Sequence, residues 1–143
     1  MVTWVWAILF APLAAGALIL FTGLPRKRLS ASLAITGLLA SFAGTVRLFL
    51  DTLTHRIELP LEVSVSWMAI PGFTIPFGIL IDPLSLLMSL VVTGVGSAIF
   101  IYAIGYMAED EGYSRFFGVL SLFAFSMLTI VLANNWIQLF MGW

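Results

Sequence analysis

Long apolar runs separated by short polar breaks are the dominant pattern of this 143-residue chain. The clearest run extends from Pro83 to Ile104 and contains no charged residue. At about 1.5 Å per residue, about 22 helical residues cover the roughly 30 Å of bilayer hydrocarbon. Asp82 marks the start, because its side chain can accept hydrogen bonds from the free amides of a first helical turn, where proline also fits. The run therefore predicts a membrane-spanning helix with a defined N-terminus.

The same criteria apply to the rest of the chain. The predicted fold class is an all-α integral membrane protein, with four transmembrane helices and the start of a fifth in a single membrane region, 1–143. The predicted spans are about 4–24, 29–50, 83–104 and 116–133, and the fifth helix begins at about 136–143.

The longest break, 51–81, has a different period. Between Leu61 and Met68 apolar and polar residues alternate, which is the pattern of a half-buried strand. Pro71 and Gly72 suit the two central positions of a type II turn, and the segment 73–81 is apolar enough for a second strand. We therefore expect a short β-hairpin between the second and third helices.

Composition supports the membrane class. The chain is 62% apolar and only 9% charged, whereas soluble domains carry about a quarter charged residues. The lipid bilayer is thus the expected main partner. A net charge of −1 gives no basis for nucleic-acid binding, and the absence of cysteine removes disulfides and thiolate metal sites.

Positive charge predicts the orientation. Arg26, Lys27 and Arg28 form the densest basic cluster and follow the first apolar run. Basic residues favour the cytoplasmic side of a membrane, so this turn is expected inside and the N-terminus outside. The third span then returns inward, which places Arg115 inside and the hairpin on the extracytoplasmic side.

A few polar residues near the spans are candidate functional positions. Asp82 could take part in a proton exit route, although a helix cap also explains it. Asn134, Asn135 and Gln138 could hold water near a channel, or form only a tight turn and one interhelical contact. Arg47, in the last turn of the second span, could contact a lipid or a partner, or extend its charge to the membrane surface.

Ionisable residues at bilayer depth usually mark ion pathways, because their burial in lipid is costly. The first, third and fourth apolar runs and the beginning of the fifth contain none. The chain also lacks phosphate-loop, haem-ligand and iron–sulfur spacings. We therefore identify no catalytic, cofactor-binding or metal residues, and no proton path through this stretch by itself.

Five linked motifs carry a family resemblance. They are WMAIPGF, FGILIDPLSLLM, VVTGVGSAIFIYAIGYM, EDEGYSRFF and LANNWIQLFMGW. In this order and spacing the chain resembles the N-terminal part of the antiporter-like subunit of respiratory complex I, NADH:quinone oxidoreductase, called subunit L in bacteria and subunit 5 in mitochondria. The resemblance is strongest over about 67–143, while the first two spans agree in pattern more than in letters.

The resemblance implies a larger machine. It implies a protein of about fourteen helices with two inverted repeats, in the bacterial inner membrane, that couples electron transfer from NADH to quinone with proton translocation. NADH, FMN, iron–sulfur clusters and quinone would then be bound in other subunits of the enzyme, and the partners would be other membrane subunits of complex I.

One departure from the family pattern is important. In relatives the MGW motif is followed by a buried glutamate, and further lysines and a histidine complete the pathway; these positions are not in this chain, which we interpret as ending before the main ion-translocating part. Two alternatives remain open: a related subunit of a multisubunit sodium/proton antiporter, membrane-bound hydrogenase or bicarbonate-uptake complex, and a stand-alone membrane scaffold or assembly module.

Overall fold

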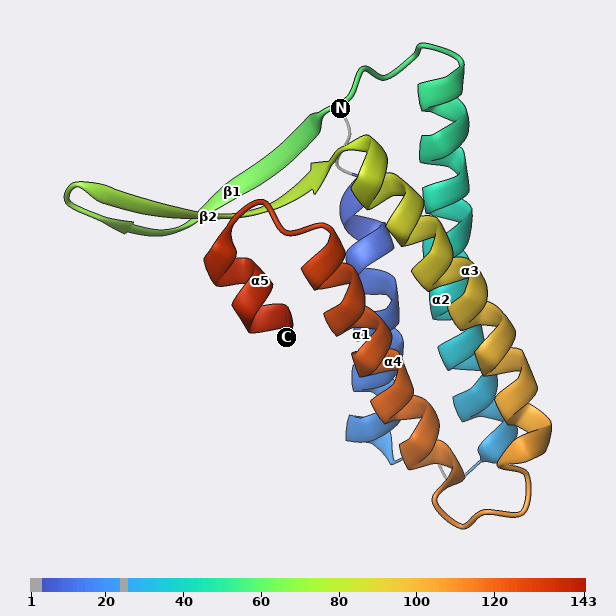
Figure 1. The fold of residues 1–143 in the computed structure, drawn as a ribbon. Coiled ribbons are helices and arrows are strands. Elements are labelled where there is room, and N and C mark those ends of the chain that lie inside the picture. Colours follow the sequence, from blue (N-terminus) through green and yellow to red (C-terminus); the bar gives the residue numbers. More distant parts are fainter. Residues whose placement is uncertain (1–3, 24–25) are drawn as a thin grey trace.

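The computed structural model describes residues 4–23 and 26–143. It is mostly helical, and a two-stranded antiparallel hairpin projects from one end of the helical bundle (Figure 1). Four helices are long and apolar enough to cross a membrane. The prediction of a mostly helical chain with four helices of membrane-spanning length and a short hairpin is thereby confirmed. The elements are α1 (Val5–Thr22), α2 (Lys27–Leu53), β1 (Leu61–Ile70), β2 (Phe73–Ile81), α3 (Pro83–Tyr106), α4 (Tyr113–Val131) and α5 (Trp136–Gly142).

Some helices extend beyond the apolar runs that predict them. α2 begins at Lys27 and ends at Leu53, and α4 begins at Tyr113. Charged residues show where the hydrocarbon ends, but backbone hydrogen bonding can continue the helix into the interface. The predicted end of the first span, Leu24, lies outside the described residues.

The helices approach closely where small residues face each other. α1 packs against both α2 and α4, and α2 also packs against α3. A Cβ atom added at Gly37 in α2 would lie 2.8 Å from the Cβ of Ala15 in α1. One added at Gly118 in α4 would lie 2.7 Å from Cδ2 of Leu20. Because lipid is as apolar as the side chains, such close van der Waals contact is a main source of helix association in a bilayer.

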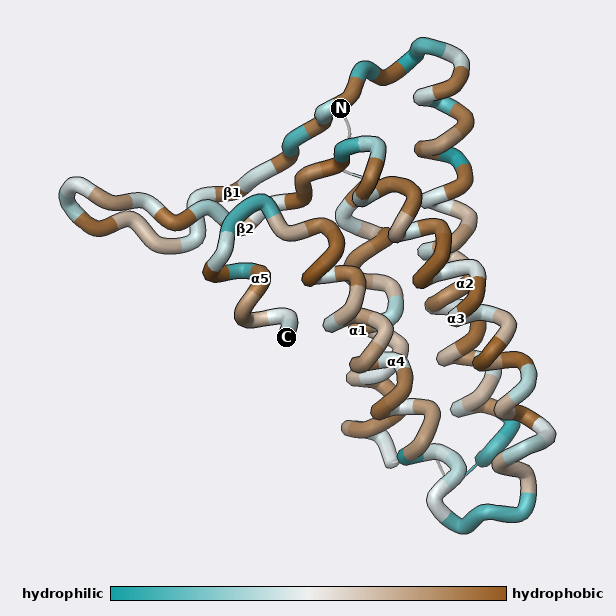
Figure 2. Tube along the Cα trace, in the orientation of Figure 1, coloured by the Kyte–Doolittle hydropathy of each residue, from teal (hydrophilic) through white to brown (hydrophobic). Residues whose placement is uncertain are grey.

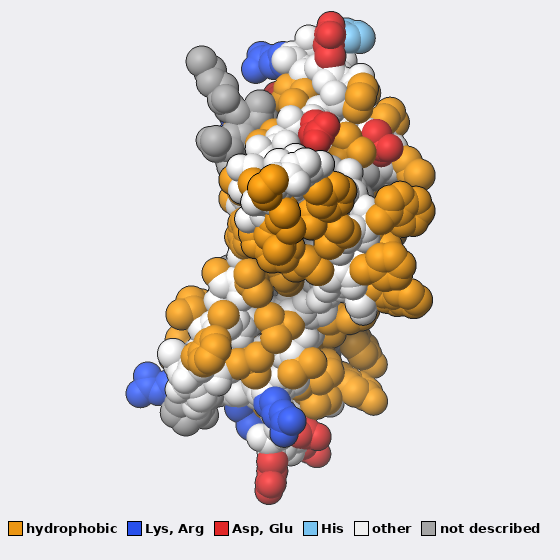
Figure 3. All heavy atoms as spheres, turned by 90° about the vertical axis from the view of Figure 1, so that its left-hand side faces the viewer, with side chains coloured by type: hydrophobic (Ala, Val, Ile, Leu, Met, Phe, Trp, Pro, Cys, Tyr) orange, Lys and Arg blue, Asp and Glu red, His pale blue; other side chains and the backbone are white. Residues whose placement is uncertain are grey.

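The outer surface is as apolar as the interior. Hydrophobic residues line the length of the bundle, and hydrophilic residues gather at its two ends (Figure 2). The space-filling view shows the same arrangement, with acidic and basic side chains at both extremities and hydrophobic side chains between them (Figure 3). Large side chains such as Leu84, Val95 and Phe123 are more than half exposed. This surface is that of an integral membrane protein.

The hairpin has the predicted turn. Its register runs from Leu61 opposite Ile81 to Ile70 opposite Phe73. Gly72 has φ of 90°, which is the left-handed conformation that the third position of a type II turn requires and that glycine adopts without steric cost. A ring stack between Trp6 of α1 and Phe77 of β2, with centroids 5.9 Å apart, holds the base of the hairpin against the bundle.

The expected half-buried strand is correct only for the inner part of β1. Leu61 and Val63 are partly buried and their polar neighbours exposed, but the side chains of Val65 and Trp67 are 59% and 53% exposed. The reason is tertiary: the outer part of the hairpin extends away from the helices (Figure 1), so the described residues leave its side chains largely uncovered. A bulge between Ser66 and Met68 also interrupts the alternation.

Candidate functional site

Three of the predicted polar residues lie together where the link between α4 and α5 meets β2; Asn134, Asn135 and Gln138 are called the amide cluster below. Gln138 is 2% exposed. Its Nε2 donates to the carbonyl oxygen of Gly78 at 2.8 Å, and its Oε1 accepts from the Gly78 amide at 3.0 Å. The side-chain amide thus satisfies both backbone groups of one strand residue, as a neighbouring strand would.

The two asparagines complete the cluster. Oδ1 of Asn135 accepts from the backbone amide of Gln138 at 2.8 Å, so Asn135 is the N-cap of α5. Its Nδ2 donates to the carbonyl of Pro76 at 2.6 Å and to Oδ1 of Asn134 at 2.7 Å. Asn134 in turn donates to Oε1 of Glu62 at 3.1 Å. The expected tight turn is therefore a bend that contacts both strands.

Backbone contacts reinforce this junction. The amide of Leu80 donates to the carbonyl of Leu132 at 2.9 Å, and Ile79 forms an isolated antiparallel bridge with Ala133. The link can approach this closely because residue 78 has no side chain. A Cβ atom there would collide with the Asn134 amide and lie 2.7 Å from Cβ of Ser64.

The chemistry of the amide cluster is that of a tether. Neutral amides do not titrate near neutral pH, so they hold geometry and cannot exchange protons as acids or bases. The Gln138 side chain uses its oxygen and one N–H on Gly78. The cluster fixes the start of α5 against β2.

Asp82 lies at the other end of β2 and acts on α3. Its Oδ1 accepts from the Ser85 amide at 2.6 Å, and its own amide donates to Oγ of Ser85 at 2.8 Å, which together form a capping box. The hydrogen bond from the Ser85 backbone is the main cause that holds the pKa of Asp82 below its ordinary value. Within the described residues no hydrogen bond or ion pair joins Asp82 to the amide cluster.

Deeper in the bundle the polar groups are hydroxyls. Ser89, Thr93 and Ser97 are buried at four-residue intervals on one face of α3. Thr93 and Ser97 each donate at 2.6 Å to the carbonyl four residues earlier. Oγ of Ser89 is buried and has no hydrogen-bond partner among the described residues. Over the ranges 4–23 and 26–143 no three or more His, Cys, Asp or Glu side chains are grouped as metal ligands.

Sequence reasoning missed two members of the site. In the sequence Glu62 is one polar position of an alternating strand, and its bond to Asn134 depends on where the α4–α5 link folds. Gly78 carried a usable signal, because glycine inside a strand often marks close approach of another backbone.

The chain is similar to known membrane proteins in sequence and in fold. Residues 67–117 match the family model of the N-terminus of chain 5 of NADH-ubiquinone oxidoreductase, complex I. The chain is 39% identical over 140 residues to NADH-quinone oxidoreductase subunit L of Mycobacterium tuberculosis, an alignment that covers 96% of this chain and 22% of that subunit. It is 49% identical over 78 residues to subunit L of Escherichia coli, covering 54% of this chain and 13% of that one.

A solved structure agrees in fold. The Mrp complex from a Dietzia species contains a chain that matches 96% of this chain and 14% of its own length, with a TM-score of 0.68 and 24% identity. The chain here spans about a fifth of the length of the curated relatives it matches, 22% for the Mycobacterium subunit.

The matched segment is similar to the N-terminus of chain 5 of complex I, and the fold is shared with a chain of the Mrp complex. The sequence relatives are subunits of NADH-quinone oxidoreductase, an enzyme complex. The resemblance seen in the sequence motifs is therefore confirmed: the chain is related to subunit L of bacterial complex I, the counterpart of chain 5.

Proposed function

We propose that this chain is the N-terminal part of a proton-translocating membrane subunit of NADH:quinone oxidoreductase. The observation that carries the proposal is the similarity to subunit L over 96% of the chain, combined with four apolar helices long enough to span a bilayer. Electron transfer from NADH to quinone would occur in other subunits, which would bind the NADH, FMN, iron–sulfur clusters and quinone. Other membrane subunits and the bilayer would be its partners.

The amide cluster has a positioning role in this proposal. Gln138 and Asn135 fix the first turn of α5 against β2 through buried hydrogen bonds. In the family the helix that begins here carries a glutamate just beyond the MGW motif. Small displacements of a proton-carrying group change transfer strongly, so a rigid helix start would keep that group in place. The function assigned to Asn134, Asn135 and Gln138 is therefore indirect.

The proposed location is the bacterial inner membrane, with the N-terminus and the hairpin outside. The α1–α2 and α3–α4 connections lie together at the end of the bundle opposite the hairpin (Figure 1), which supports placing them on the same side of the membrane. Nζ of Lys27 donates to the carbonyls of Ala108 and Asp110 at 2.9 and 2.8 Å. These connections and the adjoining helix ends carry four of the six basic residues, namely Arg26, Lys27, Arg28 and Arg115. An excess of basic residues favours the cytoplasmic side.

The pumping role is tested in the intact subunit by replacing the glutamate expected after Trp143 with glutamine. NADH-driven proton uptake by vesicles containing the reconstituted complex should fall strongly. The matched control is Glu109→Gln, which removes a carboxylate from an exposed turn and should leave uptake unchanged. Normal uptake by the first variant contradicts the proposal.

The parent complex is tested by purification of the tagged intact subunit from membranes. Recovery of the iron–sulfur and FMN subunits with NADH oxidation activity supports complex I. Recovery of membrane subunits alone points to a related transporter instead.

The orientation is tested with single cysteines, which the natural chain lacks. Thr74→Cys in the hairpin should react with an impermeant maleimide from outside, and Glu109→Cys only after permeabilisation.

A further inference from the structure

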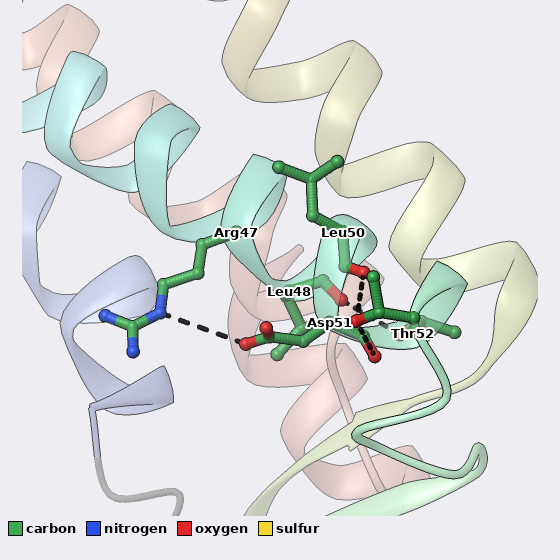
Figure 4. A network of polar contacts seen from close by, with 6 residues as sticks. Arg47, Leu48, Leu50, Asp51 and Thr52 are labelled. Carbon is green, nitrogen blue, oxygen red and sulfur yellow. Dashed lines mark hydrogen bonds and ion pairs between the residues drawn. The ribbon is translucent and has the colours of Figure 1, made fainter.

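An arginine and an aspartate form an isolated charged pair on the surface of α2, near its hairpin end (Figure 4). Nε of Arg47 lies 3.8 Å from Oδ2 of Asp51, one helical turn along the chain. The guanidinium also lies 5.0 Å from the ring centroid of Trp4. The Arg47 side chain is 71% exposed, and within the described residues it has no further polar partner. Its outward N–H groups are therefore available to a ligand.

A groove begins beside this pair. It has a volume of about 300 Å³ and lies between α1 and α2. Ala7, Ala40 and Ala43 are exposed in it, whereas the space beside Gly44 is filled by the side chain of Ile8. The small size of the three alanines leaves an apolar furrow, with Trp4 and Arg47 at one end.

The position of the pair suits the interface between hydrocarbon and headgroups. Arg47 and Asp51 lie in the last two turns of α2, and four helical residues separate them by about 6 Å along the axis. Arginine extends from the hydrocarbon edge toward water, and tryptophan also favours this level. In a bilayer that α2 spans, the two charges would lie at the depth of the lipid headgroups and the furrow along the hydrocarbon.

We propose that this groove is a binding site for one phosphatidylethanolamine molecule. The Arg47 guanidinium binds the phosphate, for which its planar array of donors is suited. The Asp51 carboxylate accepts hydrogen bonds from the ammonium group, and one acyl chain lies over the alanines. The site itself is a neutral pair, so it complements a zwitterionic headgroup: an anionic lipid would lack the ammonium and would be repelled by Asp51. Phosphatidylcholine carries no N–H for the carboxylate.

Native mass spectrometry of the full chain in detergent provides the test, with phosphatidylethanolamine, phosphatidylglycerol and phosphatidylcholine of identical acyl chains. We expect one phosphatidylethanolamine to bind at least about fivefold more tightly than either other lipid. Arg47→Gln should weaken it about tenfold, which corresponds to about 1.4 kcal/mol. Asp51→Asn should abolish the preference for ethanolamine, and Ala43→Leu should weaken all three lipids by filling the furrow.

Matched controls separate the site from general charge effects. Arg56→Gln and Glu58→Gln remove one charge each from the exposed loop after α2 and should leave lipid binding unchanged. Equal binding of the three lipids, or unchanged binding after Arg47→Gln in a variant with normal helical circular dichroism, overturns the proposal. A third result would also overturn the proposal: a protein that copurifies with the chain, prevents the binding of all three lipids, and no longer copurifies with the Ala43→Leu variant. The groove would then be a protein interface.

Discussion

The side chain of Gln138 in α5 pairs with both backbone groups of Gly78 in β2, at 2.8 and 3.0 Å, although sixty residues separate them. A buried glutamine with these two partners behaves like a short piece of strand added to the hairpin edge. This one side chain therefore joins the hairpin to the fifth helix.

Removing the tether should destabilise the chain. Gln138→Ala leaves the buried N–H and C=O of Gly78 without partners, and an unsatisfied buried group costs about 1–3 kcal/mol. We expect a loss of about 2 kcal/mol or more in the free energy of unfolding, measured by denaturant titration in mixed micelles. Hydrogen exchange at the Gly78 amide should be faster in this variant than in the natural chain.

Asn134→Ala is the comparison for this change, because it removes hydrogen bonds with Glu62 and Asn135 but leaves both backbone groups of Gly78 paired with Gln138. Its effect should be smaller, about 1 kcal/mol. Slow exchange at Gly78 in Gln138→Ala would show that the strand edge does not depend on the tether.

Glycine substitutions should have opposite signs at two positions. Gly78→Ala introduces a Cβ that meets the Asn134 amide and Ser64, and such overpacking costs about 1–3 kcal/mol. Gly105→Ala in α3 meets no atom within 4 Å and should stabilise by up to about 1 kcal/mol. Thermal unfolding of the two variants in the same detergent measures the contrast; a stabilised Gly78→Ala would contradict the close packing of the link.

The cap at Asp82 should be sensitive to pH. Its pKa is lowered in the folded chain, mainly by the Ser85 backbone hydrogen bond. The stability from the ionised cap is therefore fully present above the unfolded pKa of about 3.9 and is lost as pH falls through the lower folded pKa. Asp82→Ala should cost about 1 kcal/mol at neutral pH.

Asp82→Asn separates charge from capping, since asparagine can also cap a helix. It should keep most of the stability at neutral pH and show less change than the natural chain between about pH 5 and pH 2. The measurement is helical circular dichroism during denaturant unfolding at each pH. If the aspartate and asparagine forms lose stability equally on acidification, Asp82 is not the responsible group.

The hydrogen bond between α1 and α2 should contribute modestly to the free energy of unfolding. Oγ of Ser41 is buried and donates to the carbonyl of Ile8 in the neighbouring helix at 2.7 Å. Ser41→Ala should cost about 0.6 kcal/mol, the average for such bonds between membrane helices. Thr45→Val is a control of similar burial, because the hydrogen bond of the Thr45 hydroxyl goes to the carbonyl of Ser41 in its own helix. A larger cost for Thr45→Val than for Ser41→Ala would reverse the expected order.

Features set by local or one-dimensional rules could be predicted from the sequence. The four spans follow from the length of uninterrupted apolar runs, and the start of α3 from the adjacent Asp82 and Pro83. The turn of the hairpin follows from Pro71 and Gly72, because only a residue without Cβ accepts the observed φ without strain. These features depend on neighbours in the chain and on the bilayer as solvent.

Tertiary structure alone decided the remaining features. Three features depend on where the α4–α5 link folds. They are the choice of Asn135 as the cap of α5, the need for a residue without a side chain at Gly78, and the bond of Gln138 to a strand sixty residues earlier. The exposure of Val65 and Trp67 likewise depends on how far the hairpin extends from the bundle. Hydropathy records only whether a residue prefers lipid or water, whereas these contacts are set by directions and distances between segments that are remote in sequence.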